Sequence, residues 1–395
     1  MKTFFGFPIL FLVTTVPVVA QTTHEINTIL NERIETFAQN TLREAGLPSI
    51  QVAVGHQGAV IFEGAYGLAN IEHDVLATTQ TKYRTASISK WLTGTAAMRL
   101  YENGVLDLDL PAQIYCPAFP EKPWPITTRQ LLSHTSGIRH YLNYDALLAE
   151  TDAETARNEV IRQQTRDLIG TYTRYTDVVT SLNNFKEDPL EFEPGTQFRY
   201  SSYGYRVLAC VIEGAAGKSY SDVLLEQVLD PADMNSTLND DSRAIIMHRA
   251  TGYELQNDGT LLQAPFRDVS ENLAAGGHLS TATDLTRFAQ AFAAGLLVSD
   301  STIVFMALQP TDGSGQQIDS GYGHGVDLIG WLPGSLGHNG RQEGTTTILV
   351  LLPEEDLSIA VMSNASGWPR INVFAGTVLG IVGDLLGIHI ALPSD

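Results

Sequence analysis

Residues 83–93 read Tyr83-Arg84-Thr85-Ala86-Ser87-Ile88-Ser89-Lys90-Trp91-Leu92-Thr93. A strand-like run turns into a helix here, and Ser87 and Lys90 are spaced to share one helix face. We expect Ser87 in the first turn, where unpaired amides and the helix dipole favour developing negative charge. Lys90 can act as the base for this serine if burial or a neighbouring cation lowers its pKa. The tetrapeptide alone is weak evidence, because an N-cap serine with a surface lysine is the simpler explanation.

The composition is that of a soluble globular protein with one large domain or two lobes. The chain has 395 residues, is 44% apolar and 17% charged, and contains 34 Gly and 17 Pro. Its formal net charge is −20. This charge argues against nucleic acid as a partner, because phosphate binding needs clustered Lys and Arg. It also argues against docking on anionic membranes, but it names no substrate.

The first 20 residues have the pattern of a signal peptide. Lys2 precedes an apolar run over residues 4–19, and Val18-Val19-Ala20 provides small residues for cleavage before Gln21. A membrane anchor is the alternative, although the run contains one glycine and two prolines and is short for a spanning helix. We therefore expect export to a bacterial periplasm or beyond, with no integral membrane contact after signal removal.

The chain has two cysteines, Cys116 and Cys210. Export permits a disulfide, but nothing in the sequence shows that the two meet. Cys210 lies in the apolar run 207–212, so a buried, inert thiol is the alternative. The Cys and His residues have no metal-site spacing, and we predict no cofactor and no metal.

Hydrophobic periodicity predicts a sheet built from both ends of the chain, with a helical lobe inserted between them. Expected helices are 23–44, 87–103 and 371–386, and expected strands are 50–54, 59–64, 325–328, 345–352 and 357–362. The final helix is apolar enough that a membrane span is the alternative to packing on the sheet. The predicted fold class is α/β of the α+β type, an antiparallel sheet flanked by N- and C-terminal helices. After the signal peptide (1–20), residues 21–395 form the expected catalytic domain, with a sheet lobe at about 21–86 and 265–395 and a helical lobe at about 87–264.

Two further segments carry chemistry. Tyr200-Ser201-Ser202 lies at a loop–helix junction, and the Tyr200 hydroxyl could shuttle a proton if a nearby cation lowered its pKa. The alternative is an ordinary core or rim tyrosine. His338-Asn339-Gly340-Arg341 comes before the strand 345–352, and a strand edge beside a serine can bind an acyl substrate and supply an oxyanion amide. The alternative here is a glycine-rich turn.

Together these segments resemble the serine beta-lactamase and penicillin-binding-protein superfamily in its class C-like branch. Its three motifs are Ser-x-x-Lys, Tyr-x-Asn or Tyr-Ser-x, and Lys/His-x-Gly, and they stand here in that order at 87–90, 200–202 and 338–340. The flanks 131–138, 194–195 and 276–281 are also similar to the family. The segments 136–141, 184–190 and 198–205 are most similar to a mitochondrial serine beta-lactamase-like subfamily of proteases.

The resemblance implies roles for individual residues. Ser87 is the acylated nucleophile, Lys90 its base and Tyr200 the proton relay, and the amides of Ser87 and Arg341 hold the oxyanion. Substrate contacts fall on Ser202, His338, Gly340 and Arg341. Two of these depart from the common pattern, because Ser202 replaces an asparagine and His338 replaces a lysine. A histidine is mostly neutral near pH 7, so both changes weaken the case for beta-lactam hydrolysis.

Three neighbouring residues receive less weight. Arg341 either supplies the missing positive charge or is a surface arginine, and Glu343 is expected to be a solvated loop residue. His134, with Ser136, is assigned to a structural turn. We expect a metal-independent serine hydrolase that acts on a peptide or small-molecule substrate through an acyl-enzyme. Esters and beta-lactams are alternative substrates, and a non-catalytic scaffold is the competing class; the sequence establishes no oligomeric state.

Overall fold

The computed structural model describes residues 16–151 and 153–392. The first 15 residues of the predicted signal peptide lie outside the described residues. The predicted cleavage point after Ala20 falls within the first helix, which begins at Val16.

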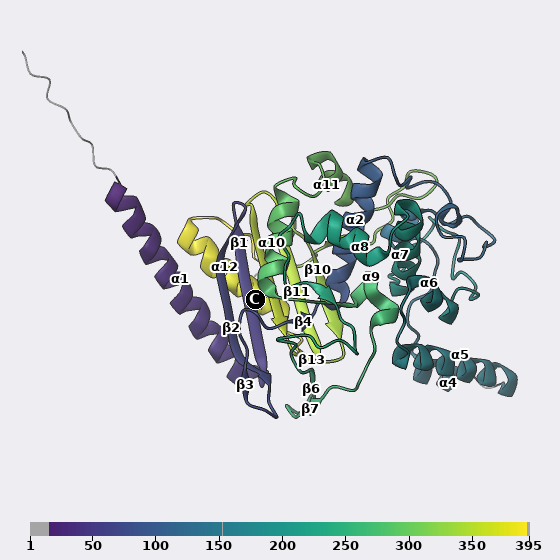
Figure 1. Ribbon diagram of the computed structural model, residues 1–395, viewed down its shortest axis with the longest axis horizontal. Helices are drawn as coiled ribbons and strands as arrows, with labels where there is room; N and C mark the ends of the chain where they lie inside the picture. Colours follow the sequence, from purple (N-terminus) through teal and green to yellow (C-terminus); the bar gives the residue numbers. More distant parts are fainter. Residues whose placement is uncertain (1–15, 152, 393–395) are drawn as a thin grey trace, which may run out of the picture.

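Strands near the two ends of the chain enclose a mostly helical segment in the sequence, as Figure 1 shows. The α-helices are α1 Val16–Ala45, α2 Ser89–Glu102, α3 Thr128–Leu132, α4 Tyr144–Glu150, α5 Glu154–Tyr172, α6 Val178–Ser181, α7 Ser202–Ala216, α8 Tyr220–Leu224, α9 Leu273–Gly276, α10 Ala282–Ala293, α11 Asp300–Met306 and α12 Ile371–Leu386. The strands are β1 Ser49–His56, β2 Ala59–Asn70, β3 Val75–Leu76, β4 Tyr83–Arg84, β5 Leu238–Asn239, β6 Tyr253–Leu255, β7 Leu261–Gln263, β8 His278–Ser280, β9 Asp327–Leu328, β10 Leu336–Gln342, β11 Thr345–Leu352, β12 Leu357–Ser363 and β13 Ala365–Ser366. Short turns η1 Ala86–Ile88, η2 Ala112–Ile114, η3 Leu182–Asn184, η4 Leu225–Leu229 and η5 Ser270–Asn272 complete the set.

The central sheet has seven strands in the order β3-β2-β1-β12-β11-β10-β9, and its neighbours pair antiparallel. β1, near the start of the chain, pairs with β12, near its end, with Gln51 opposite Met362 and His56 opposite Leu357. Both ends of the chain therefore share one sheet, with the mostly helical segment between them. The predicted fold class is confirmed.

Alternate residues of the central strands point to two separate apolar cores, as the two-residue period of a strand requires. Ile348 and Val350 of β11 face α1 and α12, whose Phe37 and Phe374 rings stack 5.0 Å apart. Leu349 and Leu351 face the other core, formed with α10 and the helical lobe. Helix α12 thus packs on the sheet, as we expected. Among the described residues, no helix is long and apolar enough to cross a bilayer.

The helical lobe contains the two cysteines, whose relationship the sequence left open. Cys116 and Cys210 form a disulfide with their Cα atoms 5.4 Å apart. Both are buried, and the bond joins the segment after η2 to the middle of α7. The alternative of a buried free thiol is therefore wrong.

Strands β2 and β10 differ from expectation in ways that bear on the site, and β9 is shorter than the expected 325–328. β2 extends to Asn70 rather than ending at Gly64, because its pairing with β1 continues to Ser49 opposite Gly67. Residues 336–342 form the strand β10. From the sequence we expected residues 338–341 to form a segment before the strand 345–352, not a strand of their own. Their glycines and polar side chains hide the apolar alternation that normally reveals a strand.

Candidate active site

Ser87 lies in the 3₁₀ turn η1, just before the α2 helix in which we expected it. Ala86, the residue before it, has a φ of 46°, a left-handed conformation that costs free energy in a non-glycine residue. Two hydrogen bonds fix the turn: the Thr85 amide donates to the His278 carbonyl at 2.9 Å, and the Thr85 and Ser89 hydroxyls are 2.8 Å apart. Ser87 stays partly exposed between buried neighbours, so a substrate can reach its hydroxyl.

Lys90 is buried beside Ser87. Its Nζ donates to Ser87 Oγ at 3.1 Å and to the Ala275 carbonyl of α9 at 2.8 Å. Burial, and then the positive charge of Arg206, hold the pKa of Lys90 well below its ordinary value. An uncharged amine at this distance can accept the Ser87 proton, so the condition stated for the Ser-x-x-Lys motif is met.

Tyr200 reaches the same place from the loop before α7. The loop is held against residues 134–135, because the Arg199 amide donates to the His134 carbonyl at 2.9 Å and the Gly195 amide to Thr135 at 2.8 Å. The Tyr200 ring centroid lies 4.3 Å from that of His134 and 4.8 Å from Lys90 Nζ. Its hydroxyl shares a hydrogen bond with Ser87. The fold thus brings together the three predicted catalytic side chains.

The condition stated for Tyr200, a pKa lowered by a nearby cation, is not met. Burial raises the pKa of the phenol well above its ordinary value, and the hydrogen bond with Ser87 acts only partly against this. The neighbouring Lys90 does not supply that cation, because its own pKa is lowered. Tyr200 is therefore a neutral phenol that can donate or relay a proton.

Strand β10 forms a further wall of the site. β9 pairs with β10 only at Leu336 and Gly337, so in the part of the chain that the structure describes no strand covers that edge from His338 onward. A Cβ at Gly340 would lie 2.2 Å from Thr347 Oγ1 and 2.5 Å from the Thr85 carbonyl oxygen. Only glycine therefore lets β10 approach the turn that carries Ser87.

The remaining predicted residues lie on β10 itself and at the start of α7. His338 is 3% exposed and neutral, because burial, then the charge of Lys90, lowers its pKa to about 3. Arg341 follows Gly340 on β10; its side chain is exposed and has no ion pair among the described residues. The amide of Ser202, the first residue of α7, donates to His140 Nδ1 at 3.1 Å. No fixed cation stands at position 338, as the sequence indicated.

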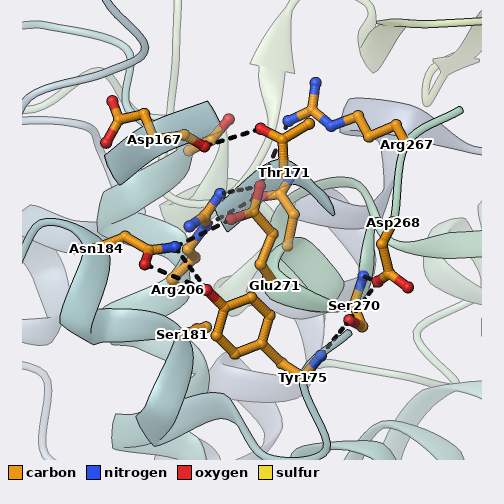
Figure 2. A network of polar contacts seen from close by, with 12 residues as sticks. Asp167, Thr171, Tyr175, Ser181, Asn184, Arg206, Arg267, Asp268, Ser270 and Glu271 are labelled. Atoms are coloured by element: carbon orange, nitrogen blue, oxygen red, sulfur yellow. Dashed lines mark hydrogen bonds and ion pairs between the residues drawn. The ribbon is translucent and has the colours of Figure 1, made fainter. Parts of the chain in front are cut away.

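Several residues beside the site were not recognised from the sequence. His134 does occupy a turn, with a φ of 59°, but its ring also supports Tyr200. Arg206 of α7 forms a buried ion pair with Glu271 at 2.9 Å, and Figure 2 shows the two side chains facing each other. The sequence could have indicated Arg206, because it lies one helical turn after Ser202 and therefore on the same helix face. No pattern in the sequence identified Glu271 as its partner.

Glu343 requires a correction. We expected a solvated loop residue, but its half-buried carboxylate pairs with Arg267 at 2.9 Å. Arg267 also lies 3.6 Å from Glu271. The acidic side chain is therefore part of a charged network that begins at Arg206.

An antiparallel sheet, a helical lobe and a Ser-Lys-Tyr group where the two meet define the beta-lactamase/transpeptidase-like class, a group of serine hydrolases. The Beta-lactamase family model matches residues 30–379, and the chain belongs to this family. The superfamily predicted from the three motifs is confirmed.

Individual relatives agree with this assignment. The human mitochondrial serine beta-lactamase-like protein LACTB is 34% identical over 301 residues, which are 65% of this chain and 55% of LACTB. The match thus spans about half the length of that relative. The octameric penicillin-binding protein homologue from Pyrococcus abyssi has a TM-score of 0.68 and 25% identity, covering 90% of this chain and 77% of its own. The D-amino acid amidase from Ochrobactrum anthropi SV3, complexed with L-phenylalanine amide, has a TM-score of 0.66 and 21% identity, covering 91% and 98%.

Proposed function

We propose that this protein is a serine hydrolase that cleaves peptide or other amide bonds through an acyl-enzyme. The observation that carries the proposal is the buried Lys90, whose Nζ lies 3.1 Å from Ser87 Oγ and whose pKa is lowered by burial and by Arg206. A surface lysine after an N-cap serine would have neither property. The Tyr200 hydroxyl, bonded to the same serine, supplies the second proton-transfer group.

The proposed reaction has two halves. Ser87 Oγ bonds to the substrate carbonyl carbon while its proton passes to Lys90, and the amides of Ser87 and Arg341 hold the negative oxygen. The bond to the leaving amine then breaks, and the amine takes the proton through Tyr200. Water adds to the acyl-enzyme, the carboxylic acid leaves, and the Ser87 hydroxyl is restored.

Two features favour an extended amide over a beta-lactam. His338 is neutral and buried, so it offers no fixed positive charge to a substrate carboxylate. A cavity of about 450 Å³, lined in part by Arg267, Glu343 and Gly344, lies at the turn where β10 ends. Ser87, Lys90, Tyr200 and His338 are not part of its lining, so only a substrate long enough to extend past the end of β10 would reach it. Esters and beta-lactams are the alternatives within this chemistry.

A fluorophosphonate probe tests the nucleophile. We expect the wild type and Ser314→Ala to be labelled and turn over p-nitrophenyl esters, and Ser87→Ala to do neither. Ser314 is the control, because it is an exposed loop serine whose hydroxyl donates to Asp312 at 2.6 Å. Undiminished labelling of a folded Ser87→Ala protein would falsify the assignment. A wild type that is neither labelled nor active would instead support the scaffold alternative.

A substrate panel tests the acyl group. It contains D- and L-amino acid amides, short peptides, p-nitrophenyl esters and a chromogenic cephalosporin. We expect the largest kcat/KM among the amides and peptides. A cephalosporin turned over faster than every amide would reverse the proposed preference.

We also propose that the protein is exported after cleavage before Gln21. The disulfide between Cys116 and Cys210 supports this, because such bonds persist mainly in oxidising compartments. N-terminal sequencing of the protein made from the full chain should begin at Gln21. A mature protein that begins at Met1 would contradict the proposed cleavage.

A further inference from the structure

An ion pair lies buried behind the candidate active site. The side chains of Arg206 and Glu271 are 1% and 3% exposed and approach to 2.9 Å (Figure 2). The guanidinium also lies 4.6 Å from the ring centroid of Tyr203, and its Nε donates to Asn272 Oδ1 at 3.4 Å. Taking two charges out of water is costly, and an apolar pair of similar volume often serves stability as well or better. The location of the pair therefore needs an explanation beyond packing.

The pair connects two elements that hold catalytic groups. Arg206 belongs to α7, which begins two residues after Tyr200. Glu271 and Asn272 belong to η5, which leads directly into α9, and the Ala275 carbonyl of α9 accepts a hydrogen bond from Lys90 Nζ at 2.8 Å. The pair thus fixes the spacing between the helix behind Tyr200 and the carbonyl that holds Lys90.

We propose that Arg206, held in place by Glu271, is a positioning residue that keeps Lys90 aligned with Ser87 and ready to accept its proton in the free enzyme. This inference rests on the proposed function and adds the group that prepares its base. Arg206 touches neither the substrate nor the reacting atoms; it acts through Lys90.

The other groups around Lys90 do not supply this effect. Ser87 of η1 and the Ala275 carbonyl are uncharged partners, and Tyr200 and Tyr205 are phenols whose pKa values burial raises. The nearby histidines are neutral at working pH, because burial lowers the pKa of His134 well below its ordinary value and those of His140 and His338 to about 3. Glu271 carries the opposing charge and is held by Arg206. Burial is the largest cause of the lowered pKa of Lys90, and the positive charge of Arg206 is the second.

Direct titration of Lys90 tests the coupling without any substrate. The chain has only six lysines, so ¹³Cε-labelled lysine gives few NMR signals, and a Lys90→Gln variant identifies the relevant one. We expect the Lys90 midpoint to move to higher pH in Arg206→Gln, because the cation is lost while Glu271 keeps only the more distant Arg267, at 3.6 Å, as an ion-pair partner. It should not rise in Glu271→Gln, which keeps the cation, or in Arg206→Lys. An unchanged midpoint in folded Arg206→Gln would overturn the proposal.

The pH profile of kcat/KM for a p-nitrophenyl ester gives the functional consequence. At pH 7 we expect Arg206→Gln to lose roughly tenfold, since each pH unit of displacement is a factor of ten on the acid limb, with recovery at higher pH. Arg206→Lys should restore most of the activity. Arg139→Gln is the matched control, because Arg139 is also buried and forms ion pairs with Asp167 and Asp188. In this variant the acid limb of the pH profile should stay at the wild-type pH.

The remaining outcomes also decide whether the inference holds. A loss in Arg206→Gln that is equal at every pH would indicate a merely structural role and overturn the inference. If Arg206→Gln does not fold, the double variant Arg206→Gln/Glu271→Gln removes both charges, and it should still raise the Lys90 midpoint. An NMR shift in a protein with no turnover at all would support the Arg206–Lys90 coupling and reject the proposed function, so the two failures are distinguishable.

Discussion

Burial acts on Lys90 and Tyr200 in the same sense, towards the uncharged form. It lowers the pKa of the amine and raises that of the phenol, which leaves one proton acceptor and one proton donor on either side of Ser87. Activity should therefore be lost as the pH falls through the pKa of Lys90 and the amine becomes charged. The pKa values of His338, about 3, and His278, about 4, lie too low to add a step between pH 5 and 8.

Removing the Tyr200 hydroxyl tests its role as the proton relay. Tyr200→Phe keeps the ring against His134 but removes the hydrogen bond to Ser87. We expect kcat/KM for an amide substrate to fall by about 10²–10⁴-fold, the usual contribution of a proton-transfer group, with little change in thermal stability. Tyr322→Phe is the control, since that hydroxyl lies in the same aromatic cluster but 3.4 Å from the Tyr205 hydroxyl. Equal losses in the two variants would show that the cluster, and not the Tyr200 proton, is responsible.

At this scale the sequence identified three candidate catalytic side chains that the fold brings together, and it missed the buried pair Arg206 and Glu271 behind them. Ser87, Lys90 and Tyr200 belong to short motifs, whose residue spacing can be read directly from the sequence. Arg206 and Glu271 are 65 residues apart in the sequence, and only packing shows that they meet at 2.9 Å. The raised pKa of Tyr200 could not be foreseen for the same reason, because its burial depends on the whole fold.

Among the elements, the contact between β10 and η1 decides whether an oxyanion site can form. Gly340 packs against Thr85 and Ala86, and the Thr347 hydroxyl donates to the Thr85 carbonyl at 3.1 Å from the neighbouring strand. The amides of Ser87 and Arg341 are carried by these two elements. Their separation is therefore set by how closely the elements pack.

Adding one methyl group tests this contact. In Gly340→Ala the new Cβ would lie 2.5 Å from the Thr85 carbonyl oxygen, so β10 and η1 must separate. We expect about 1–3 kcal/mol of destabilisation, the usual cost of overpacking, and a larger relative loss in kcat than in KM. Gly330→Ala is the control, because a Cβ there meets nothing within 4 Å. Wild-type kcat in Gly340→Ala would mean that the proposed oxyanion amides are not carried by this contact.

The sequence predicted elements well where periodicity is strong and poorly where glycine and polar residues interrupt it. The final helix was expected at residues 371–386 and is found there, because its apolar positions repeat with a helical period. β10 was not recognised, since His338, Asn339 and Gly340 have little strand propensity. Their conformation is imposed by pairing with β11, from Leu336 opposite Leu351 to Gln342 opposite Thr345.

For the whole molecule, the important feature is that distant segments must meet before the site exists. The sheet joins β1 to β12, and the site draws on η1, α7, α9 and β10. The order of the elements along the chain predicted this arrangement, but it could not predict whether the two cysteines meet. That depended on the packing of the segment after η2 against α7 inside the helical lobe.

Loss of the disulfide should therefore affect the stability of the whole fold more than the chemistry. Cys116 and Cys210 are 94 residues apart, and closing so long a loop restricts the unfolded chain. We expect Cys116→Ser/Cys210→Ser to lower the free energy of unfolding by about 2–4 kcal/mol in urea titrations. Fluorophosphonate labelling of Ser87 at 25 °C should be unchanged, because neither cysteine contacts Ser87, Lys90 or Tyr200. Wild-type protein treated with a reductant should unfold at the same urea concentration as the variant, and equal midpoints for oxidised wild type and variant would contradict the prediction.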